Sequence, residues 1–469
     1  MNLKPKKIEI DPADPFKSDL LGRKEEIQNL SLLVSNINSP GVFAIDSRWG
    51  TGKTTFIKLW ENYLKTESRP SLYFNAWQTD FSEDPLLSFL GEMNDGLKNL
   101  IGASKETHAA WEATKNAGKQ IVKRGIPALI RIGTAGILDT DKIVEDELTK
   151  FAGSLAGDVL ENYLKQKQAI SEFHTALASF VESSSNGNPL VIFVDELDRC
   201  RPNYAVELLE RIKHLFNIEG LVFVLALDKE QLSHSIKAVY GHGIDSEGYL
   251  RRFIDFEYRL KKPEITGYIE SLTLSFQFEQ FFNPRRQHKE LQNEQEHLKN
   301  VFIMLALGLK LTLREIEQLF ASVNIAIRTA KENEYIFPAL LVFLIITKQF
   351  KADLYERYVS GDADESELID YLYQIVPEKG RAESFECALV EGFLIAARYD
   401  PFQSGQSAKY LRHEAILHNE NLDHKERGYS DTVVRVVNRP AGGGQSVNVQ
   451  DIKNRIEWLS RFESFDIEA

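Results

Sequence analysis

The sequence predicts an α/β protein whose core is a parallel sheet with helices on both faces and a long helical insertion between the second and third strands. A mainly α-helical C-terminal region follows. An apolar run at residues 42–45 leads through a glycine-containing loop into a helical pattern. A second run, residues 189–195, is apolar until its final acid, as expected of a strand that helices bury on both faces. After Pro263 the patterns are helical.

The first chemically informative segment is the loop at residues 46–55, between the first strand and the next helix. Gly50 and Gly52 let the backbone pass close to an anion, so that N–H groups can point at phosphate oxygens. Lys53 is predicted to contact the β- and γ-phosphates of a nucleoside triphosphate, and the Thr54 hydroxyl to hold Mg²⁺. The helix N-terminus adds a favourable dipole. The predicted nucleotide-binding residues are Ser47, Arg48, Trp49, Gly50, Thr51, Gly52, Lys53, Thr54 and Thr55.

The loop departs in one place from the G-x-x-x-x-G-K-[ST] pattern, because Ser47 stands where the first glycine is usual. That glycine relieves a tight turn, so Ser47 fits the pattern only with a negative φ. Taken alone, the Gly-Lys-Thr triplet is also compatible with an ordinary strand, turn and helix.

Two later strands end in acids. The run at residues 189–195 ends in Asp195 and is followed by Glu196, at the edge where open α/β sheets bind ligands. We expect Asp195 to help hold Mg²⁺ and Glu196 to polarise the attacking water; the alternative is a pair of solvated strand-end acids. The run at residues 221–227 ends in Asp228. This residue is predicted either to contact the attacking water or γ-phosphate, or to cap the next helix.

A source of positive charge for the transition state is also needed, since an arginine finger can be worth ~10³–10⁵ in rate. Arg199 directly follows the acids and is alternatively expected to pair with Asp198. Arg314 is a candidate for reporting the bound nucleotide to the C-terminal region. A finger supplied by a neighbouring copy would require an oligomer. The candidates are Arg199, Arg201, Arg251, Arg252 and Arg314.

Several stretches resemble the KAP group of P-loop NTPases. They are residues 19–23 (DLLGR), 48–54 (RWGTGKT), 74–78 (FNAWQ), 195–202 (DELDRCRP), 228–232 (DKEQL) and 249–253 (YLRRF). The resemblance covers residues 15–330, with a weaker likeness at residues 311–317 (LTLREIE). It implies ATP as the nucleotide, hydrolysis used as a switch, and a role in defence against phages or mobile elements. It also implies that the strand bearing Asp228 lies between the strand that precedes the loop and the strand bearing Asp195.

The same stretches suggest roles for three further residues. Asn75 is predicted either to contact the metal-bound water or the catalytic glutamate, or to be an amide satisfied by local hydrogen bonds. Trp77 is expected to be packed. Arg23 is predicted either to bind the adenine edge or to cap a helix.

The composition indicates a globular cytoplasmic protein, with 27% charged and 43% apolar residues. Cys200 and Cys387 are too isolated for a disulfide framework or a zinc site, and no metal beyond nucleotide-bound Mg²⁺ is indicated. The N-terminus lacks the apolar segment of a secretory signal. A formal net charge of −13 argues against a broad nucleic-acid surface. The basic segment at residues 283–289 is expected to be solvated helix-end charge.

No membrane span is expected. Many relatives carry membrane hairpins in the insertion, but the apolar run at residues 126–138 is broken by Arg131 and is shorter than the ~20 residues that a spanning helix needs. Residues 336–346 form the most apolar stretch, and their length and charged flanks indicate a buried helix.

We therefore predict a nucleotide-binding core at residues 1–262, with the helical insertion at about 90–186, and a helical region at 263–469 that supplies a lid and a partner-binding part. Helices are expected at residues 298–309, 313–330 and 365–376, and a strand at 253–258. The leading hypothesis is an ATP-hydrolysing switch that acts as a homo-oligomer or with a partner protein. The alternatives are an ATP-dependent nucleic-acid remodeller and an ATP-binding scaffold without turnover.

Overall fold

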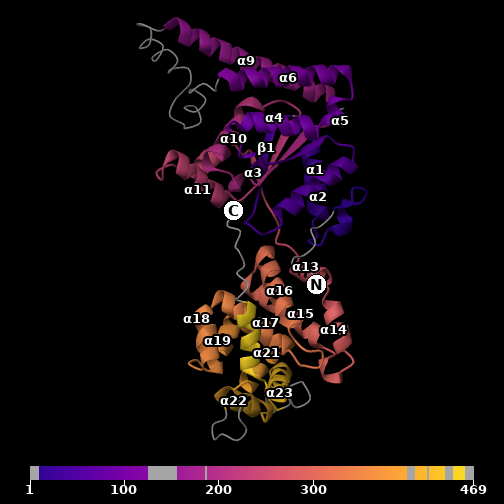
Figure 1. Cartoon of the computed structure of the whole chain (residues 1–469), viewed down its shortest axis with the longest axis vertical. Coiled ribbons are helices and arrows are strands. Elements are labelled where there is room, and N and C mark those ends of the chain that lie inside the picture. Colours follow the sequence, from indigo (N-terminus) through magenta and orange to yellow (C-terminus); the bar gives the residue numbers. More distant parts are fainter. Residues whose placement is uncertain are drawn as a thin grey trace. The chain divides into compact units, whose positions relative to one another are not determined.

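The computed structural model describes residues 10–37, 39–124, 156–184, 187–398, 407–419, 422–438 and 447–459. The chain divides into two compact units, whose helices and strands are labelled in Figure 1. We call Ile8–Pro263 the sheet unit and Glu264–Glu468 the helical unit.

The sheet unit is built on a five-stranded sheet of order β2-β3-β4-β1-β5, in which all neighbouring strands are parallel. This confirms the predicted α/β fold. The strand that precedes Asp228, β4, lies between β1 and the strand that ends at Asp195, as the family resemblance implied. The strands are β1 (Gly41–Asp46), β2 (Ser71–Asn75), β3 (Leu190–Asp195), β4 (Leu221–Leu227) and β5 (Phe256–Arg259).

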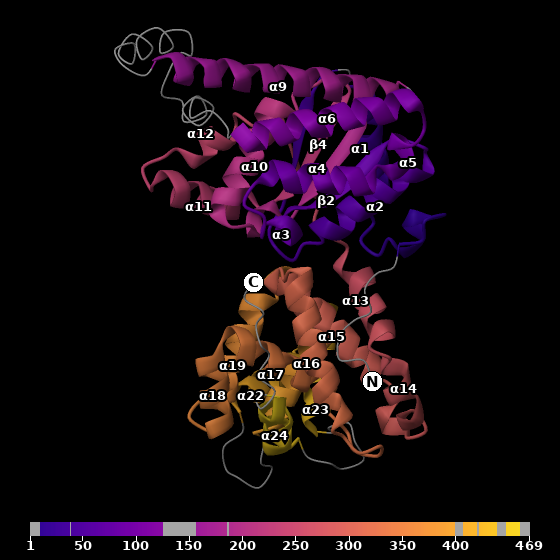
Figure 2. The same cartoon turned by 45° about the horizontal axis from the view of Figure 1, so that its top comes forward.

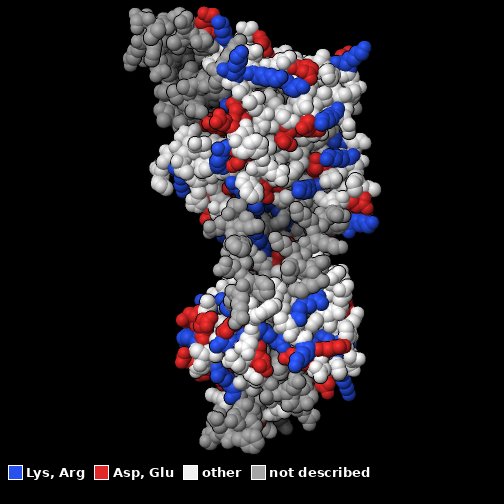
Figure 3. Space-filling model, in the orientation of Figure 1, with Lys and Arg blue, Asp and Glu red and all other residues white. Residues whose placement is uncertain are grey.

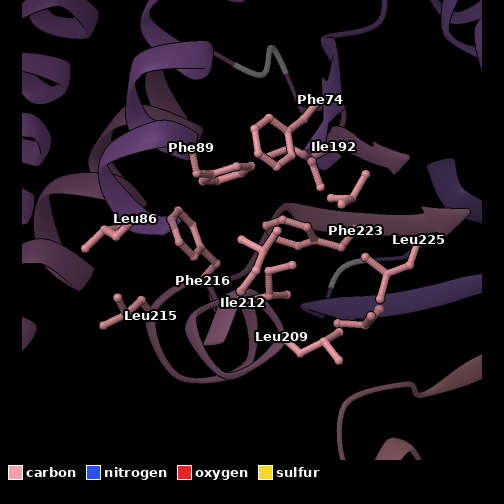
Figure 4. Close-up of a cluster of buried hydrophobic side chains, with 14 of the residues drawn as sticks. Phe74, Leu86, Phe89, Ile192, Leu209, Ile212, Leu215, Phe216, Phe223 and Leu225 are labelled. Atoms are coloured by element: carbon pink, nitrogen blue, oxygen red, sulfur yellow. The ribbon is translucent and has the colours of Figure 1, made fainter. Parts of the chain in front are cut away.

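Helices cover both faces because successive strand residues point to opposite sides of the sheet. One face carries Phe43, Val191 and Val222 and packs against α1 and α2, while Phe74 and Phe223 belong to the cluster on the other face. Figure 4 shows this second cluster, where the ring of Phe89 from α4 packs edge-on against Phe74 and Phe216. Each such phenylalanine contributes about 1.5–3 kcal/mol by its burial.

The loop leads into a helix as predicted, and this helix, α2, begins at Lys53. The predicted strand at residues 253–258 starts later, at Phe256, because Phe253 is buried in the turn that follows α12. The described helices are η1 (Pro15–Ser18), α1 (Lys24–Ser35), α2 (Lys53–Thr66), α3 (Ala76–Thr79), α4 (Pro85–Gly96), α5 (Lys98–Ile101), α6 (Lys105–Arg124), α9 (Ala156–Ser184), η2 (Leu197–Arg199), α10 (Pro202–Leu215), α11 (Lys229–Tyr240) and α12 (Ser246–Leu250).

The described part of the insertion between β2 and β3 forms helices, as predicted. Its long helices α6 and α9 lie side by side in Figures 1 and 2. The buried Trp111 of α6 packs on Phe180 of α9 with ring centroids 5.0 Å apart, and its indole N–H donates to Asn94 of α4. The apolar run at residues 126–138 lies outside the described residues.

The helical unit is all α in the part that the structure describes. Its most apolar stretch forms α17, in which every residue from Pro338 to Thr347 is buried, so this helix is core. Among the described residues, no helix combines the length and the apolar character that a membrane crossing requires. The helices are α13 (Ile265–Ser275), α14 (Phe278–Arg285), η3 (Lys289–Leu291), α15 (Glu294–Leu309), α16 (Leu313–Arg328), α17 (Pro338–Phe350), α18 (Ala352–Ser360), α19 (Glu365–Ile375), α20 (Glu378–Arg381), α21 (Phe385–Ala396), α22 (Ala408–Leu417), α23 (His424–Asn438) and α24 (Val449–Leu459).

One sequence-based expectation for this unit is wrong. Within the basic segment at residues 283–289, Arg285 is fully buried and not solvated. Its Nε lies 2.7 Å from Oε2 of the buried Glu294, and it donates to the backbone carbonyls of Lys331 and Glu332. A paired carboxylate and carbonyl acceptors replace the water that the charge loses.

A second buried polar cluster joins four helices around Glu391 of α21. Its carboxylate accepts the hydroxyl hydrogens of Tyr373 and Tyr429, and one oxygen lies 2.9 Å from Nε2 of His413. Nδ1 of His413 lies 2.9 Å from the hydroxyl of Ser430. Burial alone would raise the pKa of Glu391, but the imidazole and the hydroxyls outweigh it and hold the pKa below its ordinary value.

We expect Glu391→Gln to lower the free energy of unfolding by about 3 kcal/mol at neutral pH. Glutamine replaces one acceptor oxygen by a donor and removes the negative charge, so His413 and two hydroxyls must share a single neutral oxygen. A pKa that folding lowers contributes stability above the unfolded value of about 4.5, and that contribution disappears as the pH falls through the folded value. The difference between wild type and variant should therefore shrink below that pH. Denaturant titrations across pH, with the exposed Glu378→Gln as control, test this expectation. A difference that does not change with pH would contradict it.

Candidate nucleotide-binding site

The loop between β1 and α2 has the backbone shape of a phosphate cradle. Gly50 and Gly52 take φ of 75° and 89°, in the left-handed region that favours glycine. Ser47 is not among the residues with positive φ, so it meets the condition that its position requires. Its hydroxyl lies 2.7 Å from that of Thr51, and its N–H donates to the carbonyl of Leu227 at the end of β4. The loop is therefore tied to the neighbouring strand.

Lys53 directly follows Gly52 of this loop and is the first residue of α2. Its ammonium donates to the carbonyls of Ser47 and Arg48, which draws the loop around it. Burial lowers the pKa of Lys53, while the nearby carboxylates of Asp198 and Asp228 act in the opposite direction. Lys53 is thus a buried positive charge at the carboxyl edge of the sheet.

Asp195 ends β3 and faces the loop side of the site. It accepts a hydrogen bond of 2.9 Å from the hydroxyl of Tyr73 on β2 and another of 2.9 Å from the N–H of Glu196. Burial raises the pKa of Asp195, and hydrogen bonds from Tyr73 and Thr54 oppose that rise. The structure therefore brings together Thr54 and Asp195, the two predicted metal ligands.

The Thr54 hydroxyl donates its hydrogen to Oε1 of Glu196 at 3.1 Å, so the lone pairs of its oxygen stay available to a cation. Hydroxyl and carboxylate oxygens are the ligands that Mg²⁺ prefers, and the residues present fit this ion. Burial and the charge of Asp195 raise the pKa of Glu196. The backbone of Glu196 is itself left-handed, with φ of 62°.

Asp198 is a site residue whose position the sequence did not predict. Its Oδ2 accepts the indole N–H of Trp49 at 2.7 Å and the backbone N–H of Asp228 at 2.9 Å. Asp228 in turn accepts the backbone N–H of Trp49 at 3.2 Å with one oxygen and caps α11 with the other. Capping was one of its two predicted roles, and contact with the γ-phosphate stays a prediction. The only signal for Asp198 was its place in the acidic run after β3.

The candidate arginines are dispersed. Arg199 pairs through Nε with Glu196, so the alternative prediction, a pairing with Asp198, is wrong. Arg201 donates to the carbonyls of Asp80 and Ser82. Arg251 and Arg252 follow α12 and are exposed, whereas Arg314 is an exposed residue of α16 in the helical unit. The arginine-finger assignments stay predictions.

Three other predicted residues have clear local partners. Asn75 caps α3 by accepting the N–H of Gln78, which agrees with a locally satisfied amide. Trp77 is 37% exposed, so the expectation of a packed indole is wrong; its ring covers the guanidinium of Arg199. Arg23 makes no side-chain cap, and its buried guanidinium pairs with Glu26.

This combination of sheet and site defines a class. A parallel sheet, a glycine loop leading to Lys53 and Thr54, and Asp195 with Glu196 at the end of a nearby strand are the features of a P-loop NTPase. Residues 23–330 match the model of the KAP family P-loop domain, and the chain belongs to this family.

Among curated proteins, the chain is similar to the phage T7 exclusion protein of Escherichia coli K12, with 22% identity over 379 residues. The match covers 76% of this chain and 41% of that protein, so the chain spans about two fifths of its relative. Solved structures similar to the chain include Cdc6p from Pyrobaculum aerophilum, with 15% identity, a TM-score of 0.32 and coverage of 98% and 88% of the two chains. The ADP form of the Aeropyrum pernix ORC2 protein has 12% identity, a TM-score of 0.30 and coverage of 97% of each chain.

Proposed function

We propose that this protein binds and hydrolyses ATP and that hydrolysis operates a conformational switch. The observation that carries the proposal is the arrangement of four residues at one edge of the sheet. Glu196 accepts the hydroxyl hydrogen of Thr54 and donates its N–H to Asp195, and the ammonium of Lys53 lies near the carboxylate of Asp195. Family membership supports a nucleoside triphosphate as the ligand.

In the proposed reaction the protein mainly positions and neutralises charge, since phosphoryl transfer needs little covalent help from the enzyme. Lys53 contributes a buried positive charge to the phosphates. Thr54 and Asp195 would hold Mg²⁺, which when bound neutralises charge on the phosphate oxygens. Glu196 accepts a hydrogen bond from the attacking water and orients it.

The similarity to a phage exclusion protein supports a role for the switch in phage or mobile-element defence. We propose that the helical unit and a further protein or a second copy of this chain carry the signal.

A nucleic-acid remodeller is less well supported. Figure 3 shows one face of the molecule, in the orientation of Figure 1. On its described residues, acidic and basic side chains are interspersed, without the basic stripe that phosphate neutralisation requires. We expect ATP turnover to be unchanged by added DNA or RNA. Stimulation at moderate salt would favour the remodeller.

The function is tested by measuring ATP hydrolysis of the purified chain over a concentration series, with mass photometry on the same samples. Specific activity that rises together with a larger species indicates an arginine supplied in trans. Slow turnover of a monomer, independent of concentration, indicates a switch that awaits a partner. ATP binding without any turnover in either state would remove the ATPase proposal and favour the scaffold.

The acid limb of the pH profile should report Glu196. Its raised pKa places the protonated, inactive form at higher pH than for an ordinary glutamate. We expect kcat/KM to be retained above this pKa and to fall about tenfold per pH unit below it. Measuring kcat/KM from pH 4 to pH 8 in buffers of constant ionic strength tests this, with ATP affinity recorded at each pH. A fall explained wholly by lost affinity would contradict the assignment.

A further inference from the structure

The carboxylate of Glu196 is held from two sides. Oε1 accepts the hydroxyl hydrogen of Thr54, and Oε2 forms an ion pair with Nε of Arg199. A carboxylate has about four acceptor positions, so each oxygen keeps capacity for a water hydrogen. The left-handed backbone of Glu196 is unfavourable for a residue with a side chain, and its surroundings must maintain it.

The guanidinium of Arg199 is fixed in its turn by two indole rings. Its Cζ lies 6.0 Å from the ring centroid of Trp49 and 5.7 Å from that of Trp77. A cation is attracted to the face of an indole ring at this range. Since Trp49 belongs to the phosphate-binding loop and Trp77 follows β2, Arg199 contacts both structures.

Trp49 is in a fixed position as well. Its indole N–H donates to Asp198 and its backbone N–H to Asp228, so the ring cannot turn away while these bonds hold. A movement of the loop at Trp49 therefore shifts one of the two rings that hold Arg199.

We propose that Arg199 is a positioning residue that orients Glu196 toward the attacking water and links this orientation, through Trp49, to the position of the phosphate-binding loop. The proposal rests on the ATPase function proposed above, and it assigns Arg199 a role other than that of an arginine finger. A finger must extend to a phosphate oxygen, whereas this guanidinium is bonded to Glu196 at Nε and lies between two rings.

The test compares wild type with Arg199→Gln and Arg199→Lys. We expect Arg199→Gln to lower kcat by about 10- to 100-fold, part of the contribution of a positioned base, while ATP affinity stays within about twofold. Lysine should restore only part of kcat, since it keeps the charge but cannot present a planar guanidinium to the two rings. Lys98→Gln, which removes an exposed positive charge from α5, is the control.

Single-turnover measurements in a Glu196→Gln background separate the two possible roles of Arg199. A residue that acts through Glu196 should cause no further loss of rate when it is replaced there, whereas a finger should cause its full loss. Such a full loss, or an unchanged kcat in Arg199→Gln, would overturn the proposal and leave the ATPase function intact. Absent turnover in wild type that still binds ATP would overturn both.

Discussion

Replacing Glu196 with glutamine is expected to lower kcat for ATP hydrolysis by ~10²–10⁴-fold while ATP affinity changes little. Glutamine has nearly the same shape, and its carbonyl oxygen can still accept the hydroxyl hydrogen of Thr54. It carries no charge, so it neither accepts a proton nor pairs with Arg199. The loss should therefore fall on the chemical step and not on nucleotide binding.

The variant should trap ATP, which gives a second measurement besides turnover. After incubation with labelled ATP and removal of free nucleotide, the wild type should retain ADP or nothing, and the variant intact ATP. Glu219→Gln, an exposed glutamate in the turn before β4, is the matched control. Equal turnover in wild type and Glu196→Gln would remove the catalytic assignment and favour an ATP-binding scaffold.

The sheet could be predicted because its information is local. The runs that became β3 and β4 are apolar on both faces, which is required of central strands in a sheet covered by helices on both sides. The loop could be predicted for the same reason, since Gly50, Gly52 and Lys53 are close together in the sequence. The two glycines supply the left-handed backbone, and Lys53 supplies the charge.

The connections within the site could not be predicted, because they depend on residues far apart in the chain. Trp49 and Asp198 are hydrogen-bonded across 149 positions, and no pattern along the sequence links them. The partner of Arg199 was predicted incorrectly for a local reason. The left-handed backbone of Glu196 and the following η2 turn bring Glu196, and not the adjacent Asp198, to its Nε.

The burial of a charged side chain was also predicted incorrectly, and Arg285 shows why. Its sequence neighbours suggest a solvated cluster, yet the acceptors that satisfy it, Glu294 and the carbonyls after α16, come from other segments. Whether a charged residue is buried depends on acceptors that only the folded chain brings together.

Replacing Lys53 with alanine is expected to weaken ATP binding by about 100-fold, because a charge-assisted hydrogen bond is worth about 1.5–3 kcal/mol and the neighbouring acids add repulsion. The ammonium lies near four carboxylates, those of Asp46, Asp195, Asp198 and Asp228. Without it, an incoming polyphosphate meets uncompensated negative charge in a largely buried site. The loss should therefore exceed that caused by removing an exposed lysine.

Isothermal titration of ATP in the presence of Mg²⁺ measures this effect directly. Lys65→Ala, which removes an exposed lysine from the last turn of the same helix, should leave the affinity unchanged and serves as the control. The loop itself provides a second comparison: Lys53→Arg keeps the charge but is too large to sit beneath the carbonyls of Ser47 and Arg48. It should bind ATP better than the alanine variant and worse than wild type. Unchanged affinity in Lys53→Ala would mean that the phosphates bind elsewhere, and the assignment of the loop as their cradle would have to be abandoned.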